Sequence, residues 1–347
     1  MAGFQSQAHR GAALVLGATG TIGSAVAKAL LDDGWEVVAL TRDPSRAQRR
    51  SGLGAIRWIA GDAMNAADVS AAARGAKLIF HGVNPPGYRN WRGLALPMMK
   101  SSIEAARSSG ARLVLLGTIY NYGPDAWPIL TEDSPQHPRT RKGKVRVEME
   151  GLMRGAAKDG VRSLIVRAGD FFGPDAKNSW LTQGILTAAK PLRMMRYPGD
   201  GRIGHAWAYV PDLAQTVARL AAMEADLPAF EMLNFGGHWL EHGIEITEAV
   251  RRVLGRPDLP IRPFPWLLVH LGAPFVTFMR EVIEMRYLWK EPLRLDNSKL
   301  VRLLGAEPHT PLDQAIRLTL QALGFVDEAT LDATRRHSDP RGLAFPR

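Results

Sequence analysis

The stretch that decides the fold of this 347-residue chain reads Ala12-Ala13-Leu14-Val15-Leu16-Gly17-Ala18-Thr19-Gly20-Thr21-Ile22-Gly23. Its apolar beginning predicts a buried strand over Ala12–Ala18, and the residues after it predict a helix over Thr21–Asp33. Three glycines lie between strand and helix. In this spacing the first permits a tight turn, the second lets backbone approach a pyrophosphate, and the third lets helix and strand pack closely.

A second apolar run, Trp35–Thr41, follows at the distance expected for a strand–helix–strand unit. The stretch therefore predicts a dinucleotide-binding turn, with the phosphates at the positive end of the helix. The alternative is a tight turn that binds no ligand, and the regular spacing of the three glycines makes this alternative the weaker one. We expect cofactor contacts from Gly17, Thr19, Gly20, Thr21, Ile22 and Gly23.

Working outward, short apolar runs alternate with helical patterns through the first half of the chain. The predicted strands are Ala12–Ala18, Trp35–Thr41, Ala55–Ala60, Lys77–Val83, Arg112–Gly117 and Arg162–Arg167. The predicted helices are Thr21–Asp33, Ala66–Arg74, Gly93–Ser109 and Arg141–Lys158. This alternation predicts an α/β fold, a Rossmann-type doubly wound parallel sheet with helices on both faces. Ligands of such sheets bind where the strands' carboxyl ends meet.

The alternation becomes irregular after about residue 174. Helices are predicted at Leu181–Ala189, Leu213–Glu224, Ile246–Leu254, Trp266–Leu288 and Leu312–Leu323, with one more sheet strand at Phe230–Phe235. We expect a Rossmann domain over 1–175, to which 200–237 returns. A smaller, mostly helical substrate lobe takes 176–199 and 238–330, and a basic tail takes 331–347. A ligand cleft between the lobes follows.

Composition bounds the function. The formal charge is +10 and Cys is absent, which excludes disulfides and thiolate chemistry and fits a reducing, cytoplasmic location. The most apolar stretch, Phe264–Met279, is shorter than the roughly 20 residues of a membrane span, and we interpret it as core helix rather than a membrane-surface element. Two basic clusters, at 42–50 and at 139–146, lack interleaved aromatic residues and a nucleic-acid motif, so nucleic acid is a minor alternative.

Five segments follow one another in a characteristic order: the glycine turn 17–23, Gly61-Asp62, the run 117–123, the run 167–174 and the run 209–214. In this order and spacing they resemble the extended short-chain dehydrogenase/reductase family, which includes nucleotide-sugar epimerases and dehydratases. The resemblance covers about residues 12–325. It implies that Thr118 takes the catalytic Ser/Thr position. It also implies cofactor contacts from Asp62, Ala63, His81, Gly82, Val83, Ala168 and Gly169.

The residues after the second strand indicate the cofactor. An acid there binds the ribose of NAD, whereas Arg accommodates the extra phosphate of NADP. Arg42 lies at this point and Arg46 one turn later, and guanidinium pairs well with phosphate. NADP(H) is therefore our prediction. Asp43 keeps NAD(H) possible, because a shift of one residue would restore the acid.

One departure from the family matters most. The family carries Tyr-x-x-x-Lys after the fifth strand, with Tyr as acid/base and Lys on the cofactor ribose. Here Thr140 takes the Tyr position and Lys144 the Lys position, with Glu148 as a frequent family acid. An aliphatic alcohol titrates several units above a phenol, so Thr cannot replace that acid. The remaining candidate acids are Tyr120, Tyr122 and Tyr88, although packing is an alternative role for Tyr122.

The leading hypothesis is an NADP(H)-dependent oxidoreductase or epimerase/dehydratase-type enzyme acting on a small organic carbonyl or alcohol. Thr118 would hold the substrate oxygen and Lys144 the ribose, although Lys144 also fits a solvated face. The alternative is a non-catalytic, redox-sensing NAD(P)-binding regulator, which Thr140 favours. A homodimer is implied by the resemblance. No metal is expected, because His238-x-x-Glu241-His242 follows a strand-to-loop signal rather than lying on a helix.

Overall fold

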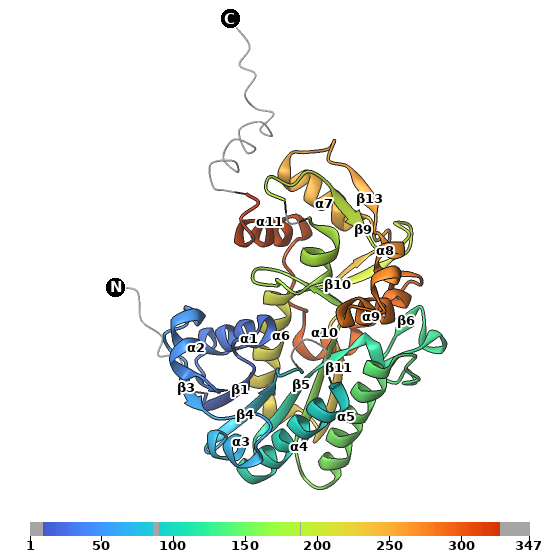
Figure 1. The fold of residues 1–347 in the computed structure, drawn as a ribbon. Helices are drawn as coiled ribbons and strands as arrows, with labels where there is room; N and C mark the ends of the chain where they lie inside the picture. Colours follow the sequence, from blue (N-terminus) through green and yellow to red (C-terminus); the bar gives the residue numbers. More distant parts are fainter. Residues whose placement is uncertain (1–9, 86–89, 188, 327–347) are drawn as a thin grey trace, which may run out of the picture.

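The computed structural model describes residues 10–85, 90–187 and 189–326. Its largest sheet has seven parallel strands in the order β11-β7-β5-β4-β1-β2-β3 (Figure 1). The strands are β1 Ala12–Leu16, β2 Glu36–Thr41, β3 Arg57–Ala60, β4 Ala76–His81, β5 Arg112–Thr118, β7 Ser163–Ala168 and β11 Phe230–Asn234. The predicted doubly wound parallel sheet is confirmed.

Six helices connect these strands and cover both faces of the sheet. They are α1 Thr21–Asp32, α2 Pro44–Ser51, α3 Ala66–Ala72, α4 Trp91–Ser109, α5 Arg141–Lys158 and α6 Val210–Ala222. The side chain of Asp43 accepts a hydrogen bond from Arg46 N at the start of α2. Thr140 does the same for Gly143 N at the start of α5, so both helices begin at a capping side chain.

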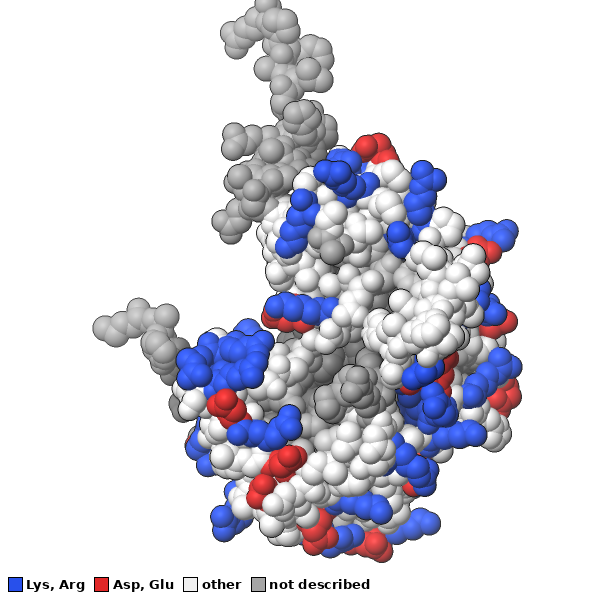
Figure 2. Space-filling view, viewed as in Figure 1, with Lys and Arg blue, Asp and Glu red and all other residues white. Residues whose placement is uncertain are grey.

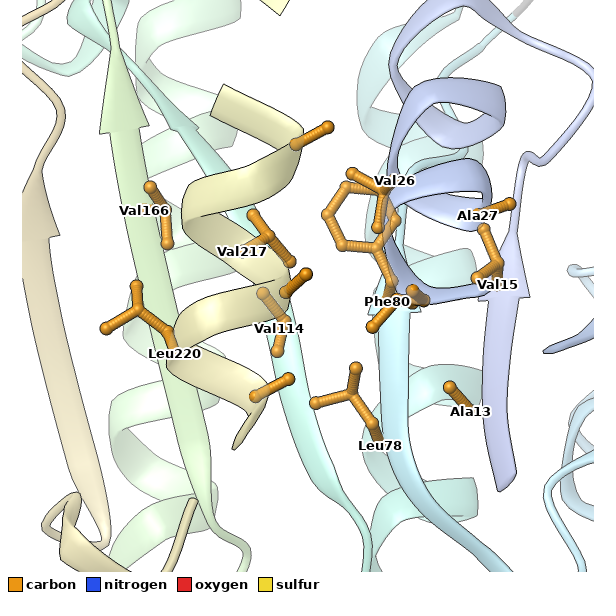
Figure 3. Packing of buried hydrophobic residues seen from close by; sticks show 14 of the residues in the cluster. Ala13, Val15, Val26, Ala27, Leu78, Phe80, Val114, Val166, Val217 and Leu220 are labelled. Carbon is orange, nitrogen blue, oxygen red and sulfur yellow. The ribbon is translucent and has the colours of Figure 1, made fainter. Parts of the chain in front are cut away.

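The alternation of side chains along β1 explains the two cores. Ala13 and Val15 join a cluster with α1 and α6, which Figure 3 shows from close by. Leu14 and Leu16 join the opposite cluster, with α3, α4 and α5. Because successive strand residues point to opposite faces, a strand covered on both sides is apolar throughout. This is why the run 12–16 lacks polar residues.

The remaining elements form a smaller lobe beyond the carboxyl ends of the strands (Figure 1). One sheet there has the order β12-β10-β8, and two pairs of short strands join β13 to β9 and β14 to β6. The strands are β6 Ile129–Leu130, β8 Asp170–Phe172, β9 Met195–Tyr197, β10 His205–Tyr209, β12 His238–Leu240, β13 Ile261–Pro263 and β14 Arg294–Leu295. The helices are α7 Glu245–Leu254, α8 Trp266–Gly272, α9 Thr277–Glu284, α10 Ser298–Leu304 and α11 Leu312–Ala322.

The predicted helix Trp266–Leu288 is wrong as a single element. The structure breaks it into α8, α9 and a 3-10 turn, Arg286–Trp289. Pro274 lies between α8 and α9, where its ring and missing N–H prevent a continuous helix. The core interpretation of Phe264–Met279 is also wrong, because large apolar side chains there are exposed, Phe275 by 88%.

The predicted helix Leu181–Ala189 shortens to a single π-helical turn, Leu181–Ile185, after which Leu186 is extended. Within the predicted returning segment 200–237, α6 and β11 belong to the large sheet and its core, whereas β10 pairs with β8 and β12. Leu300 of α10 packs in the core of the large sheet, although we expected its segment in the smaller lobe.

Among the helices of the described ranges, none combines the length and the apolar character that a membrane crossing requires. The predicted tail 331–347 and Tyr88 lie outside the residues that the structure describes.

A buried carboxylate joins the sheet domain to the C-terminal segment. Asp212, in the first turn of α6, is 6% exposed and accepts hydrogen bonds from Thr310 N at 2.6 Å and Thr310 Oγ1 at 2.7 Å. Asp212 is thus an anchor for the segment that leads into α11.

We expect Asp212→Ala to lower the free energy of unfolding by about 1–3 kcal/mol, because it leaves the half-buried N–H and hydroxyl donors of Thr310 without their acceptor. Urea unfolding followed by circular dichroism measures the change. The exposed Asp226 on the same connection is the control, and Asp226→Ala should stay within about 0.5 kcal/mol of the unmodified protein. Equal losses for the two variants would contradict the anchoring role.

Candidate functional site: a cofactor cleft and the helix beside it

The glycine turn forms a close backbone contact at the centre of the sheet. Gly17 has φ +83°, and a Cβ at this residue would lie 2.5 Å from the carbonyl oxygen of Gly82. A Cβ at Gly23 would lie 2.1 Å from the carbonyl oxygen of Gly17. Neither residue can carry a side chain without moving backbone. The turn therefore leaves a cradle of bare backbone at the start of α1.

This cradle lies where the strand order reverses. β1 pairs with β2 on one side and with β4 on the other, so connections leave in opposite directions from this point. In open α/β sheets the crevice outside the carboxyl ends at such a point is where dinucleotides bind, with their two halves on opposite sides. The residues present therefore fit a dinucleotide cofactor.

A cleft of about 670 Å³ extends from the cradle over the β2 side. Its lining includes the predicted residues Thr19, Gly20, Thr21, Arg42 and Arg46, together with Ser24, Arg50 and Lys177. Figure 2 shows basic side chains gathered on the surface over α2, the helix that contributes Arg46 and Arg50 to the lining of this cleft. The cleft is thus a cationic site built on a helix N-terminus, a combination that suits phosphate groups.

Asp43 also lines the cleft, but its carboxylate caps α2 by accepting from Arg46 N at 2.9 Å. The side chain that would favour a ribose hydroxyl is therefore engaged locally. Asp175 and Thr21 close the far wall, since Thr21 Oγ1 donates to the carbonyl oxygen of Asp175 at 2.9 Å. This bond ties the start of α1 to the segment that leads into the smaller lobe.

The other predicted cofactor residues lie around the cleft rather than in its lining. His81, Gly82 and Val83 end β4 beside Gly17. Asp62 and Ala63 follow β3, and Asp62 N donates to Asp68 at 2.9 Å. Further along the same edge, two more predicted residues follow the central strands, namely Ala168 at the end of β7 and then Gly169. Ile22 packs against the core of the sheet.

His81 is buried beneath the cofactor edge. Its Nδ1 lies 2.8 Å from Ser102 Oγ. Burial, and next the charge of Arg146, lower the pKa of His81 to about 3. The imidazole is therefore neutral at physiological pH, which suits a structural hydrogen bond better than proton donation.

Thr118 ends β5 at the same edge, on the β4 side of the cradle. Its Oγ1 donates to Asn121 Oδ1 at 3.1 Å. Asn121 donates to Gln136, which donates to Glu150 of α5 at 2.7 Å. Arg167 pairs with Glu150 at 2.8 Å and donates to the Thr118 carbonyl oxygen at 2.5 Å. This closed ring of hydrogen bonds fixes Thr118 against one face of α5.

Tyr120 and Tyr122 follow Thr118 in a 3-10 turn and at its end. Tyr122 is fully buried and its ring lies 4.8 Å from the guanidinium carbon of Arg167. Burial raises the pKa of the Tyr122 phenol, with Arg167 opposing the shift. A buried phenol with a raised pKa fits packing better than acid catalysis. Tyr120 is half-buried and packs at the edge of a cluster with Trp127 and Tyr287.

The polar and basic side chains at the start of α5 differ in burial. Thr140 caps the helix and is buried, and Lys144 is exposed. Glu148, one turn further, pairs with Arg92 at the surface. By contrast, Lys142 is 4% and Arg146 is 6% exposed. The role of Lys144 stays a prediction, and its exposure gives it no support.

Sequence reasoning counted Lys142 and Arg146 only as members of a basic cluster. Arg146 Nη2 donates to Asn84 Oδ1 at 2.8 Å, just after β4. Lys142 Nζ lies 2.7 Å from Glu281 of α9, a residue of the smaller lobe that is itself largely buried. The signal that could find them is the pattern of apolar residues on α5, because Val145, Met149 and Met153 mark the buried face.

His238 and His242 do not share a helix, as the strand-to-loop signal before them predicts. His238 lies in β12 and His242 follows it in a loop. Burial, followed by the charge of His309, lowers the pKa of His238 to about 4, and His242 lies 3.6 Å from Glu245. The two histidines thus have separate local partners.

Comparison with known proteins identifies the class. Residues 13–236 match the NAD dependent epimerase/dehydratase family, and the chain belongs to this family. A 3-diazoavenalumate denitrifying reductase from a Streptomyces species is 29% identical over 232 residues, which are 61% of this chain and 72% of that protein. The chain is thus an NAD(P)-dependent enzyme of the oxidoreductase/epimerase type.

Solved structures share the fold at low identity. UDP-glucuronic acid 4-epimerase from Bacillus cereus, in complex with UDP-glucuronic acid and NAD, is 18% identical with a TM-score of 0.71, covering 90% of this chain and 99% of that one. dTDP-glucose 4,6-dehydratase from Bacillus anthracis, in complex with NAD, is 14% identical with a TM-score of 0.71, covering 93% and 99%.

We expect Gly23→Ala to weaken NADPH binding by more than about tenfold and to lower the free energy of unfolding by about 1–3 kcal/mol, because its Cβ would overlap the Gly17 carbonyl. Fluorescence titration and urea unfolding measure the two effects. Gly151→Ala on α5 is the control, since a Cβ there meets nothing within 4 Å and should leave both values unchanged or raise stability slightly. Normal binding by Gly23→Ala would contradict the cradle.

Proposed function

We propose that the protein is an NADP(H)-dependent reductase of a small organic carbonyl compound. The observation that carries the proposal is the cationic cleft, in which Arg42, Arg46 and Arg50 line one wall while Asp43 is engaged in capping α2. Such a wall attracts the additional phosphate of NADP, and it offers the ribose hydroxyls of NAD no free acid from Asp43.

The bound cofactor would supply a hydride to the substrate carbon. Of the chain's own groups, Gly17, Gly20 and Gly23 would receive the pyrophosphate at the start of α1. Thr118 would hold the substrate oxygen at the carboxyl end of β5, by turning its single hydroxyl proton from Asn121, which accepts it in the absence of substrate, to that oxygen. A hydrogen bond to a developing alkoxide stabilises the transition state more than the ground state.

The reductase direction is supported by the Streptomyces relative, whose name describes a reductase. The substrate side is supported by the smaller lobe, where Trp127 and Tyr287 stack with ring centroids 5.9 Å apart in the cluster that Tyr120 joins. We infer a substrate with an apolar part, because this aromatic cluster adjoins the turn that follows Thr118.

Two finer points belong to the same proposal. The lack of cysteine supports a location in the reducing cytoplasm. The resemblance to short-chain dehydrogenases supports a homodimer as the working assembly, with a small molecule rather than nucleic acid as the ligand.

We expect Arg46→Ala to weaken NADPH binding about 10- to 100-fold and to leave NADH binding unchanged, because one charge-assisted contact to the 2′-phosphate is lost. Calorimetric titration with each cofactor measures the difference. Arg49→Ala removes an equally exposed charge from the same helix outside the cleft lining, and it should change neither affinity. A parallel loss of NADH affinity in Arg46→Ala would argue against a phosphate clamp.

Hydride transfer is tested directly with NADPH that carries deuterium at both C4 positions. The protein is incubated with this cofactor and a metabolite extract, and products are searched by mass spectrometry. We expect a product that is about one mass unit heavier than its unlabelled reduced standard, because one deuterium replaces one hydrogen, and its identity also reveals the substrate class. Tight NADPH binding without any labelled product would instead favour the non-catalytic sensor, or an epimerase or dehydratase that returns its hydride within one turnover.

A further inference from the structure

Helix geometry decides which residues of α5 face the site. Side chains two positions apart are rotated by about 200° around a helix, whereas those four apart are rotated by only about 40°. Lys144 and Glu148 therefore share one face, and Lys142 and Arg146 lie on the opposite one. The two sets cannot both face the cofactor edge.

The hydrogen-bond ring around Thr118 identifies the inner face. Glu150 lies four residues after Arg146, and its carboxylate reaches both Gln136 and Arg167, which in turn hold Thr118. The start of the same helix packs against the turn after β5, because a Cβ at Gly143 would lie 2.1 Å from the carbonyl oxygen of Tyr120. The face of Lys142, Arg146 and Glu150 is thus the one turned to Thr118.

Arg146 reaches the other half of the cofactor crevice. Its contact, Asn84, follows β4 by three residues, beyond Gly82 whose carbonyl touches the glycine turn. The arginines of α2 occupy the β2 side, which leaves the β4 side for the nicotinamide half. Arg146 is held on that side by Asn84 and by the ring of Trp91, 5.2 Å from its guanidinium carbon.

Lys142 lies one turn before Arg146, between the sheet edge and the smaller lobe. Its ammonium pairs with Glu281 at 2.7 Å, and both groups are largely buried. The neighbouring Arg141 is 81% exposed and contacts Glu281 and Glu284 at longer range. This buried ammonium, held by a carboxylate of the smaller lobe, thus lies at the contact between α5 and that lobe.

We propose that Lys142 and Arg146 are the site pair of α5, with Lys142 as the proton donor to the substrate oxygen and Arg146 as the anchor of the nicotinamide ribose. This assignment rests on the proposed reductase function. It places the proton donor at residue 142 instead of 140 and the ribose anchor at residue 146 instead of 144. The family's phenol–ammonium pair is thereby replaced by an ammonium–guanidinium pair.

The proposed reduction balances with these groups. A hydride and its electron pair pass from the cofactor to the carbonyl carbon, and the π electrons of the C=O bond move to oxygen. The N–H bond of Lys142 breaks as its proton passes to that oxygen, giving the alcohol, the oxidised cofactor and a neutral amine. Solvent returns the proton to Lys142 afterwards. Arg146 does not exchange protons and remains charged throughout.

The ribose role is tested by binding alone. We expect Arg146→Met to weaken NADPH binding by about tenfold or more, while adenosine 2′,5′-bisphosphate, which lacks the nicotinamide half, binds as to the unmodified protein. Lys144→Met, the control on the opposite face, should change neither affinity. An unchanged NADPH affinity in Arg146→Met, or an equal loss for both ligands, would overturn the ribose role.

The proton-donor role is tested by Lys142→Arg, which keeps the positive charge opposite Glu281 but cannot release a proton at neutral pH. With the deuterated NADPH and metabolite extract described above, we expect the initial rate of labelling to fall about 10²- to 10³-fold with NADPH affinity unchanged. Lys144→Arg should retain the full rate. A merely structural ion pair would be restored by Arg, so a normal rate in Lys142→Arg would overturn this role.

The two proposals fail in different ways. An unmodified protein that binds neither NADPH nor the bisphosphate would overturn the cofactor assignment and this inference with it. An unmodified protein that binds NADPH but labels no product would overturn the reductase and the proton donor, while Arg146→Met would still decide the ribose role.

Discussion

The structure depends on one backbone contact, the approach of the glycine turn to the end of β4. Gly17 and Gly82 touch main chain to main chain, and Gly23 lets α1 press against Gly17. A side chain at Gly17 or Gly23 would push apart the strands between which the sheet reverses direction. The crevice, the exposed N–H groups at the start of α1 and the position of β4 all follow from this contact.

Electrostatics divides the crevice into two unlike halves. On the β2 side the cations are exposed arginines of the short helix α2, whose side chains can rearrange around a phosphate group. On the β4 side they are buried members of α5, each held by a partner from another element. Exposed charges attract a ligand and discriminate between ligands. Buried charges lose their hydration on folding, and the partner groups that replace the water hold them in a fixed geometry.

Much of the fold could be predicted from the sequence, because strands covered on both faces are continuous apolar runs. The run 12–16 and the spacing of its glycines are local signals, and local signals also single out Arg42 and Arg46, which line the cleft beside the glycine turn. The glycine spacing alone already implied the helix N-terminus that receives phosphates.

The basic residues of α5 do not by themselves indicate its buried face, although the apolar residues Val145, Met149 and Met153 do. Basic residues at 141, 142, 144 and 146 give no periodicity, and the family spacing points to Lys144. Which of them is buried depends on the tertiary contact between Gly143 and Tyr120. The apolar run 264–279 misleads for a related reason, since apolar composition predicts burial only when a partner surface exists.

The hydrogen bond between Thr21 and Asp175 links two segments that lie far apart in the sequence. One end belongs to α1, whose start forms the glycine cradle, and the other to the segment that enters the smaller lobe. A nucleotide bound at the start of α1 would therefore also hold in place the segment that leads into the smaller lobe, where we propose that the substrate binds. Such an arrangement favours an ordered kinetic sequence, in which the nucleotide arrives first and leaves last.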